Sequence, residues 1–233
     1  MDSIFDSTEF NQNLFFPRSD YSNPPANAEE IYVEVDSEIR VHARKFLRNE
    51  ARFSLIFFHG NGEIVSDYND LARAFGEIGG ELIVIDYRGY GKSSGYPSLR
   101  TVLKDACSIF EYLTKNKIVR SDLCVMGRSL GSASAIELGI NFPEIGCLVI
   151  ESGYADPIPL VERRGLKVDS VNLKDNAIFN NSQKIKKIKT PLLIMHGKND
   201  MIISYEEAEL NFKNAGSKVK ELELIDEVGH NDI

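Results

Sequence analysis

Residues 123–131 of the chain read LCVMGRSLG, and this stretch decides the fold. Residues 123–126 are apolar and have the length of a short buried strand. They run into the pattern G-x-S-x-G, in which Ser129 stands between Gly127 and Gly131. A helix rich in small residues is predicted to follow over 130–140. Because side chains beside a sharp strand-to-helix turn would collide, the two glycines predict a tight turn that exposes Ser129.

Strands and helices alternate on both sides of this turn. Apolar runs predict further strands at residues 54–58, 82–85, 148–150 and 192–195, and residues 219–225 are predicted to form the last strand. Helical spacing of apolar residues predicts helices over 68–78 and 99–113, the second with Ser98 as its N-cap. A capping box at 204–207 begins a further helix. The alternation predicts an α/β fold with a mostly parallel, doubly wound sheet.

Three parts of the chain are distinguished by their composition. Residues 1–30 are polar and aromatic and are predicted to form an irregular N-terminal arm. The main domain is expected over 31–233, and it begins with an antiparallel hairpin formed by the alternating runs 31–35 and 39–47. Residues 155–190 interrupt the strand–helix rhythm and are interpreted as an inserted lid.

The composition narrows the range of functions. The chain has 233 residues, a net charge of −8 and no long basic run, which argues against nucleic acid as a partner. We expect no signal peptide, because the N-terminus has no basic region followed by an apolar run, and no transmembrane segment, because no apolar run approaches the roughly 18 residues that span a bilayer. Cys107, Cys124 and Cys147 lack metal-ligand spacing, which predicts buried reduced thiols, no metal and a cytoplasmic location. No cofactor is expected.

The histidines are the candidates for a base that activates Ser129. A free serine hydroxyl is a poor nucleophile near neutral pH, so it needs such a base. His42 lies in the hairpin as an expected surface residue, while His59 and His196 end buried strands, where structural roles are expected. His230 follows the last strand in a loop that leaves its ring free to face Ser129, and it is the predicted general base.

A carboxylate is then needed to orient His230 and to stabilise its charged form. Asp200 follows the strand at 192–195, and the carboxyl ends of parallel strands meet at one edge of the sheet. The resulting chain order is Ser129, Asp200, His230, which is not the order of chymotrypsin or subtilisin. Glu151, at the end of the preceding strand, is the alternative acid.

Two backbone N–H groups are expected to stabilise an oxyanion beside Ser129. The first belongs to Leu130, which directly follows the serine. The second is expected in the loop after residue 58, at Asn61 of His59-Gly60-Asn61-Gly62. The alternative for this loop is a plain tight turn.

The sequence from about Ile31 to His230 resembles the α/β-hydrolase superfamily. The matching segments, in order, are His59–Gly62, Asp86–Ser93, Gly127–Gly131, His196–Asp200 and Gly229–His230. The chain is similar to small esterase and thioesterase-like members with short lids, some of which remove fatty acyl groups from proteins. The resemblance implies a serine hydrolase that cleaves an ester or thioester through an acyl-enzyme on Ser129. The loop after residue 58 departs from the His-Gly-Gly-Gly segment of the hormone-sensitive-lipase group.

Several interpretations stay open beside this one. Asp86 stands where a phosphate-binding loop ending at Ser93 would need glycine, so the segment is predicted to be a structural turn with Arg88 held by a carboxylate. The segment 155–190 has eight Lys or Arg and four Asp or Glu. This excess indicates either a solvated face or a lid that attracts an anionic substrate or lipid surface. A ligand-binding or receptor-like scaffold and a cofactor-free perhydrolase are the alternatives to an esterase.

The end of the chain raises a separate expectation. Only three residues follow His230, too few for the helix that would cover the last strand. If the chain is complete, apolar surface beside 219–225 should favour a homodimer, and His230 should be poorly positioned. A longer natural chain is the alternative.

Overall fold

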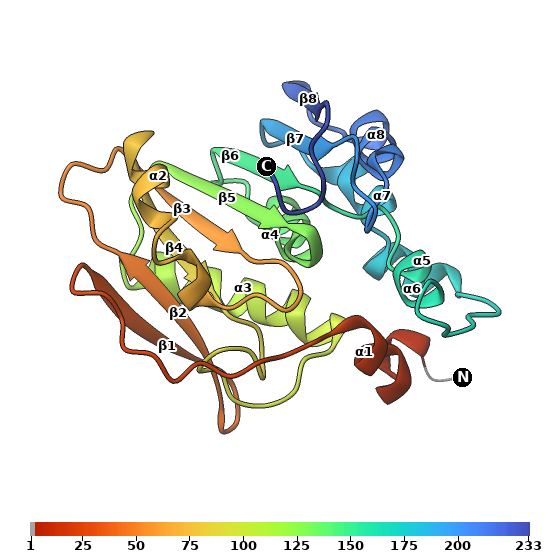
Figure 1. The fold of residues 1–233 in the computed structure, drawn as a ribbon, viewed down its shortest axis with the longest axis horizontal. Helices are drawn as coiled ribbons and strands as arrows, with labels where there is room; N and C mark the ends of the chain where they lie inside the picture. Colours follow the sequence, from red (N-terminus) through yellow and green to blue (C-terminus); the bar gives the residue numbers. More distant parts are fainter. Residues whose placement is uncertain (1–2) are drawn as a thin grey trace.

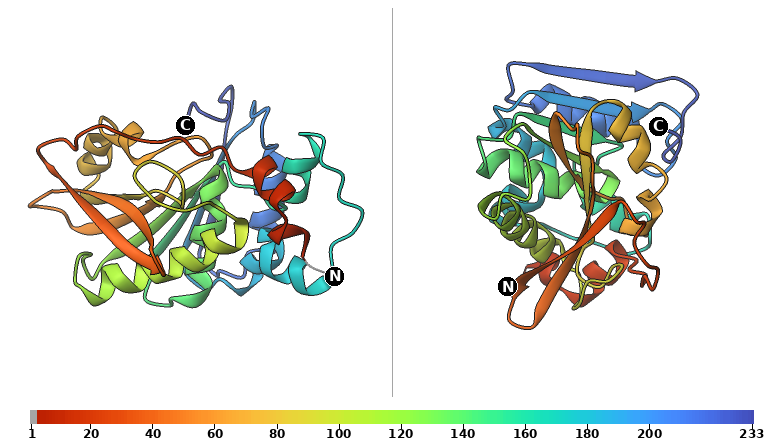
Figure 2. Two further views of the ribbon diagram at one scale, coloured as in Figure 1. Left: turned by 90° about the horizontal axis from the view of Figure 1, so that it is seen from below. Right: turned by 90° about the vertical axis from the view of Figure 1, so that its left-hand side faces the viewer.

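An eight-stranded sheet forms the centre of the molecule in the computed structural model, which describes residues 3–233 (Figure 1). The strands are β1 (Ala28–Asp36), β2 (Ile39–Phe46), β3 (Phe53–Phe58), β4 (Gly80–Ile85), β5 (Leu123–Arg128), β6 (Cys147–Glu151), β7 (Leu192–Gly197) and β8 (Lys220–Ile225). Their order is β1-β2-β4-β3-β5-β6-β7-β8. β2 pairs antiparallel with β1 and β4, and all other pairs are parallel. The predicted α/β class, parallel sheet and N-terminal hairpin are confirmed, and Figure 2 shows the hairpin and β8 at opposite ends.

Both faces of the central strands are covered, which explains their continuous apolar runs. Successive side chains of a strand point to opposite faces. Ile56 of β3 and Val125 of β5 are wholly buried in the larger core, together with side chains from α3 (Leu99–Lys115) and α4 (Ser132–Asn141). Phe57 belongs to a smaller core on the other face, with η2 (Val65–Tyr68) and α2 (Ala72–Glu77).

The helix predicted over 68–78 is broken into η2 and α2. Tyr68 is buried and Phe75 packs against the same smaller core. Leu71 and Ile78, however, are 52% and 57% exposed. Both lie just outside α2, as its N-cap and C-cap residues, so the helical spacing read from the sequence does not apply to them.

The two predicted helix starts have different outcomes. Ser98 caps α3 as predicted, and its side chain accepts a hydrogen bond from a backbone N–H of the first turn. The capping box predicted at 204–207 is wrong, because Ser204 makes no side-chain cap at the start of α8 (Tyr205–Asn214). The Glu207 carboxylate instead accepts a hydrogen bond from the Ala155 N–H at 2.6 Å. It thereby provides an acceptor for a backbone N–H group in the segment that follows β6.

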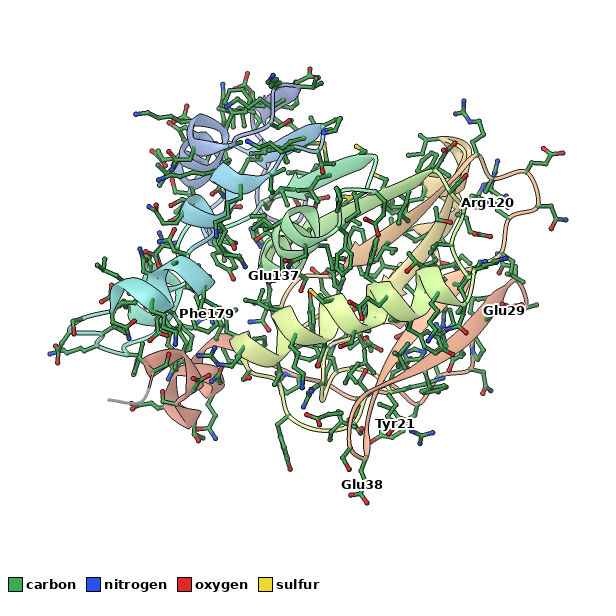
Figure 3. The ribbon with its side chains drawn as sticks, turned by 180° about the vertical axis from the view of Figure 1, so that it is seen from behind. Tyr21, Glu29, Glu38, Arg120, Glu137 and Phe179 are labelled. Carbon is green, nitrogen blue, oxygen red and sulfur yellow. The ribbon has the colours of Figure 1, made fainter. Side chains whose placement is uncertain are left out.

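The segment between β6 and β7 contains α5 (Ile158–Glu162), α6 (Leu173–Phe179), α7 (Asn181–Lys184) and η4 (Ile185–Lys187). Its two ends meet, since the Ser182 N–H donates to the Ala155 carbonyl at 3.0 Å. Phe179 packs on Phe5 of the N-terminal arm, with ring centroids 4.4 Å apart (Figure 3). Lys184 of α7 pairs with Glu137 of α4 at 2.5 Å. Residues 155–190 are therefore anchored to two other parts of the molecule, and their role as a lid stays a prediction.

The three cysteines are free, as predicted, but Cys107, Cys124 and Cys147 are partly exposed and not buried. Cys124 and Cys147 lie opposite each other on the adjacent strands β5 and β6. Within residues 3–233 no helix combines the length and apolar character needed to cross a membrane.

The N-terminal arm is more ordered than the sequence suggests. The described part contains η1 (Ile4–Asp6) and α1 (Thr8–Leu14), and β1 begins at Ala28. Ser7 caps α1 by accepting a hydrogen bond from the Phe10 N–H, and Phe10 and Leu14 are buried in the larger core. The prediction of an irregular arm is wrong for residues 4–14, because so short a helix is stabilised by tertiary packing and not by its own sequence, whereas residues 15–27 contain no helix or strand.

Two phenylalanines of the arm test this packing. Phe10 has no exposed surface, whereas Phe16 is 49% exposed. We expect Phe10→Ala to lower the free energy of unfolding by about 3–5 kcal/mol. Phe16→Ala, the matched control, should lower it by less than about 1 kcal/mol. Urea unfolding of both variants measures the difference, and equal small losses would show that the arm is not part of the core.

Candidate active site

Ser129 lies at the sharp turn between β5 and α4, within η3 (Ser129–Gly131). Its φ of 50° is in the left-handed region, which non-glycine residues rarely occupy and which costs on the order of 1–3 kcal/mol. A Cβ on Gly127 would lie 2.3 Å from the Gly131 carbonyl oxygen. A Cβ on Gly131 would lie 2.1 Å from the Phe58 carbonyl oxygen of β3. The turn therefore excludes any side chain at both positions, as the motif predicts.

The structure brings together the three side chains that the sequence selects. His230 Nε2 lies 2.9 Å from Ser129 Oγ, and His230 Nδ1 lies 2.6 Å from Asp200 Oδ2. With its proton on Nδ1, the imidazole donates to Asp200 and accepts the Ser129 hydroxyl hydrogen. Asp200 lies in the loop after β7, and His230 lies in the loop after β8. Because β7 and β8 are neighbouring parallel strands, both loops lie at the same edge of the sheet.

The Asp200 carboxylate is held in place by the backbone of its own loop. Its Oδ1 accepts hydrogen bonds from the N–H groups of Ile202 and Ile203, each at 2.8 Å. His196 Nε2 lies 3.0 Å from Oδ2. Burial would raise the pKa of Asp200, but hydrogen bonds from His196, His230 and the Ile203 N–H hold this pKa well below its usual range. The group is therefore a fixed anion at neutral pH.

The alternative acid, Glu151, is engaged elsewhere. Its Oε1 accepts a hydrogen bond from Arg128 Nε at 2.9 Å. Burial raises the pKa of Glu151, and the Arg128 charge opposes this shift. Among residues 3–233, the carboxylate that accepts from the His230 ring is that of Asp200.

His230 is better held than expected for a residue near the end of the chain. Besides its two ring contacts, its carbonyl oxygen accepts a hydrogen bond from Arg128 Nη2 at 2.8 Å. Only 8% of its side-chain surface is exposed. These contacts hold both the ring and the backbone of His230 in the described structure.

The loop after β3 is fixed through the side chain of Asn61. Asn61 Oδ1 accepts from the Phe16 N–H at 2.9 Å and from the Tyr90 hydroxyl at 2.6 Å. Asn61 Nδ2 donates to the Leu14 carbonyl at 2.6 Å. The backbone N–H groups of Asn61 and Leu130 have no acceptor within residues 3–233. Both groups are thus available, and their role toward an oxyanion stays a prediction.

His42 and His59 hold a second aspartate. His42 Nδ1 lies 2.6 Å from Asp86 Oδ2, and His59 Nε2 lies 3.4 Å from Asp86 Oδ1. Burial would raise the pKa of Asp86, but hydrogen bonds from both histidines keep it well below its usual range. The prediction of a surface His42 was wrong, because β2 lies inside the sheet between β1 and β4 and leaves this ring no exposed surface.

The structure also shows the partners of Arg88 and of two arginines in residues 155–190. Arg88 is held by Asp105 through two hydrogen bonds, Nε to Oδ2 at 2.6 Å and Nη2 to Oδ1 at 2.8 Å, as predicted. Arg164 donates to the Asn13 carbonyl at 2.6 Å, and Arg163 donates to the Ile202 carbonyl. Part of the excess positive charge of residues 155–190 therefore bonds within the protein, and attraction of an anionic substrate stays a prediction.

Sequence reasoning missed Arg128 and Glu63. Arg128 occupies the variable position just before Ser129, and Glu63 follows the segment 59–62. Their side chains form an ion pair beside the nucleophile. The positions next to two recognised motifs were the available signal, but a sequence does not show that the two motifs meet.

Comparisons with known proteins find relatives that match most of the chain. A family model described as serine aminopeptidase, S33 (Hydrolase_4) matches residues 49–168 and 159–232. Protein bem46 of Schizosaccharomyces pombe is 30% identical over 233 residues, covering 93% of this chain and 77% of that protein. Alpha/beta hydrolase domain-containing protein 17B of Homo sapiens is 28% identical over 223 residues, covering 91% of this chain and 73% of that protein.

Solved structures show the same fold. The esterase Pf2001 of Pyrococcus furiosus, in space group P21, matches with a TM-score of 0.75 at 20% identity, covering 93% of this chain and 91% of that one. Est1E of Butyrivibrio proteoclasticus, bound to ferulic acid, has a TM-score of 0.69 at 22% identity, covering 86% and 90%. At these identities the likeness establishes the fold and leaves the substrate open.

The buried Asp200 anion predicts a specific dependence of stability on pH. A carboxyl whose pKa is lowered by folding stabilises the protein above its unfolded pKa of about 3.9, and this contribution is lost as the pH falls. We therefore expect Asp200→Asn to lower the free energy of unfolding by about 2 kcal/mol at neutral pH. Below pH 4, the difference in free energy of unfolding between the wild type and Asp200→Asn should decrease by up to about 1.4 kcal/mol per pH unit.

Urea unfolding across this pH range measures the gap. Asp226→Asn is the matched control, because the Asp226 side chain is 79% exposed and its ion pair with Lys198 lies on the surface. That variant should match the wild type within about 0.5 kcal/mol at every pH. A pH-independent gap for Asp200→Asn would contradict the assignment of a buried anion.

Proposed function

The chain belongs to the family described as serine aminopeptidase, S33 (Hydrolase_4), and we propose that it is a serine hydrolase that cleaves a carboxylic ester or thioester. The observation that carries this proposal is the continuous series of hydrogen bonds from Asp200 through His230 to Ser129. Nucleophile, base and orienting acid in such contact are what acyl transfer through a serine requires.

In the first half of the proposed reaction, Ser129 Oγ attacks the carbonyl carbon of the substrate. His230 Nε2, 2.9 Å away, takes the hydroxyl proton as the new C–O bond forms. Asp200 keeps the imidazole proton on Nδ1 and stabilises the imidazolium. The backbone N–H groups of Leu130 and Asn61 donate to the oxyanion, and losing one such donor usually costs about 10²–10³ in rate.

The intermediate then collapses, and the bond from the carbonyl carbon to the leaving alcohol or thiol breaks. His230 returns its proton to the leaving group, which departs and leaves an acyl group on Ser129. Water next attacks the carbonyl carbon of this acyl-enzyme with His230 as base. The bond to Ser129 Oγ breaks, the carboxylic acid is released, and His230 returns the proton to the serine. The strained φ of 50° at Ser129 supports this scheme, since backbone strain is often found at functional sites.

Two alternatives are separable by experiment. A ligand-binding protein on the same scaffold would lack an activated serine and would not react with a fluorophosphonate. A perhydrolase would use the same three residues, with hydrogen peroxide in place of water. Hydrolysis of p-nitrophenyl esters of increasing chain length, alongside thioester and amide analogues, identifies the acyl and leaving groups.

The nucleophile is tested by changing one hydroxyl. Ser129→Ala should abolish both fluorophosphonate labelling and ester turnover without unfolding the protein, because no oxygen remains to form the acyl bond. Ser134→Ala is the matched control, since Ser134 is a buried serine of α4 whose hydroxyl has no partner within residues 3–233. It should label and turn over like the wild type. Full activity of the Ser129 variant would refute the proposal.

The acid is tested by comparing two carboxylates. Asp200→Asn should reduce kcat by up to about 10⁴-fold, because the amide favours the wrong imidazole tautomer. Glu151→Gln should reduce it far less, because Glu151 bonds to Arg128 and not to the His230 ring. Steady-state kinetics of both variants measures the ranking, and the reverse order would move the acid to β6.

A further inference from the structure

The Arg128 guanidinium lies where four separate segments of the chain meet. Its Nε donates to Glu151 at the end of β6, and its Nη1 pairs with Glu63 in the loop after β3. Its Nη2 donates to the His230 carbonyl at 2.8 Å and to Asn231 Oδ1 at 2.7 Å. Arg128 itself ends β5 and directly precedes Ser129. One side chain thus bonds to segments that carry both the proposed base and a proposed oxyanion donor.

Glu63 transmits this contact to the oxyanion loop. Its Oε2 accepts hydrogen bonds from the Gly60 N–H at 2.8 Å and from the Tyr68 hydroxyl at 2.5 Å. A Cβ on Gly60 would lie 2.7 Å from both Arg128 Nη1 and Glu63 Oε1. A side chain at position 60 would therefore require the ends of both the Arg128 and the Glu63 side chains to shift. Asn61, whose backbone N–H is the proposed donor, is the next residue.

On the opposite side, Arg128 holds the backbone of the loop after β8. The His230 ring contacts Ser129 and Asp200, but these contacts do not fix the main chain that carries the ring. The Asn199 N–H holds the Val228 carbonyl at 2.9 Å, and the two Arg128 Nη2 hydrogen bonds, to the His230 carbonyl and to Asn231 Oδ1, hold the chain at His230 itself. Since misplacing a reacting group by about 1 Å costs on the order of 10²-fold in rate, support of this backbone matters for catalysis.

The charges and geometry explain why arginine is needed here. Only 11% of the Arg128 side chain is exposed, and its two carboxylate partners are 24% (Glu63) and 10% (Glu151) exposed. A guanidinium has five donors in a rigid plane and can bond in several directions at once. Lysine has one compact ammonium group and cannot reach Glu63, Glu151 and the His230 loop together.

We propose that Arg128 is a positioning residue that holds the His230 loop and the oxyanion loop in register with Ser129. This inference rests on the proposed function for its effect on kcat. Its structural part, support of the loop after β8, does not depend on any activity.

The experiment compares Arg128→Ala, Arg128→Lys and Asn231→Ala with Arg88→Ala. Arg88 is the matched control, because it is a buried arginine with two hydrogen bonds to one carboxylate but no contact with the proposed catalytic residues. We expect kcat for a p-nitrophenyl ester to fall on the order of 10²-fold in Arg128→Ala, with KM little changed. Arg128→Lys should recover only part of the loss. Asn231→Ala, which removes one hydrogen bond and no charge, should show a smaller loss of kcat.

Two further readouts separate positioning from general stability. Arg128 lines a cavity of about 670 Å³, so added guanidinium ion at a non-denaturing concentration can enter and should partly restore kcat of Arg128→Ala. It should not raise kcat of Arg88→Ala. Hydrogen–deuterium exchange of the backbone over 226–233 should rise in Arg128→Ala and Asn231→Ala but not in Arg88→Ala.

The outcomes separate this inference from the proposed function. If the wild type hydrolyses no ester and takes no fluorophosphonate label, the proposed function fails, while faster exchange over 226–233 in the Arg128 variants would still support the positioning role. If Arg128→Ala does not fold, Arg128→Lys and Asn231→Ala carry the same test. Wild-type kcat and unchanged exchange in the folded variants would overturn the inference.

Discussion

The close approach of Gly131 to the Phe58 carbonyl oxygen is the contact on which the site depends. Because position 131 has no Cβ, the start of α4 lies directly against the end of β3, and β5 turns into the helix within a few residues. This turn holds Ser129 at a φ of 50° and leaves the Leu130 N–H without an acceptor among the described residues. The loop that carries Asn61 leaves from the same end of β3. One steric constraint therefore sets the turn at Ser129 against the end of β3, where the loop that carries the second proposed donor begins.

Two buried aspartates at the carboxyl edge of the sheet have similar partners, but the histidines that contact them differ in exposure. Asp86 and Asp200 each follow a parallel strand, each contact two histidines, and each have a pKa held below its usual range by those contacts. Both histidines of Asp86 are wholly buried, so that cluster links β2, β3 and β4 and has no access to a substrate. One histidine of Asp200, His230, retains 8% exposure and touches Ser129. The two aspartate–histidine clusters thus differ in what the second ring nitrogen contacts: in the Asp200 cluster, His230 Nε2 reaches Ser129 Oγ.

The remaining parts of the site are held by segments that are distant in sequence. The N-terminal arm fixes Asn61 through the Leu14 carbonyl and the Phe16 N–H, although 47 and 45 positions separate them. Arg128 reaches the His230 carbonyl across 102 positions. Hydrogen bonds between distant segments therefore hold the loops around Ser129 in place, while the apolar core beneath holds the strands. Each of these contacts joins segments that the tertiary structure brings together.

The sequence by itself determined the α/β class, the elbow at Ser129, and the order Ser129, Asp200, His230, because strand burial and the glycines at 127 and 131 leave local patterns. It also indicated Asp200 over Glu151, and the Asp200–His230 contact agrees with that ranking. The helix of the arm, the burial of His42 and the failure of the capping box at Ser204 left no such pattern. Each depends on which distant residue is nearby: the core under Phe10, β4 beside His42, the Ala155 N–H beside Glu207. The tertiary structure alone decided these features and the contacts of Arg128, because a hydrogen bond or an apolar contact is specified by positions in space and not by spacing along the chain.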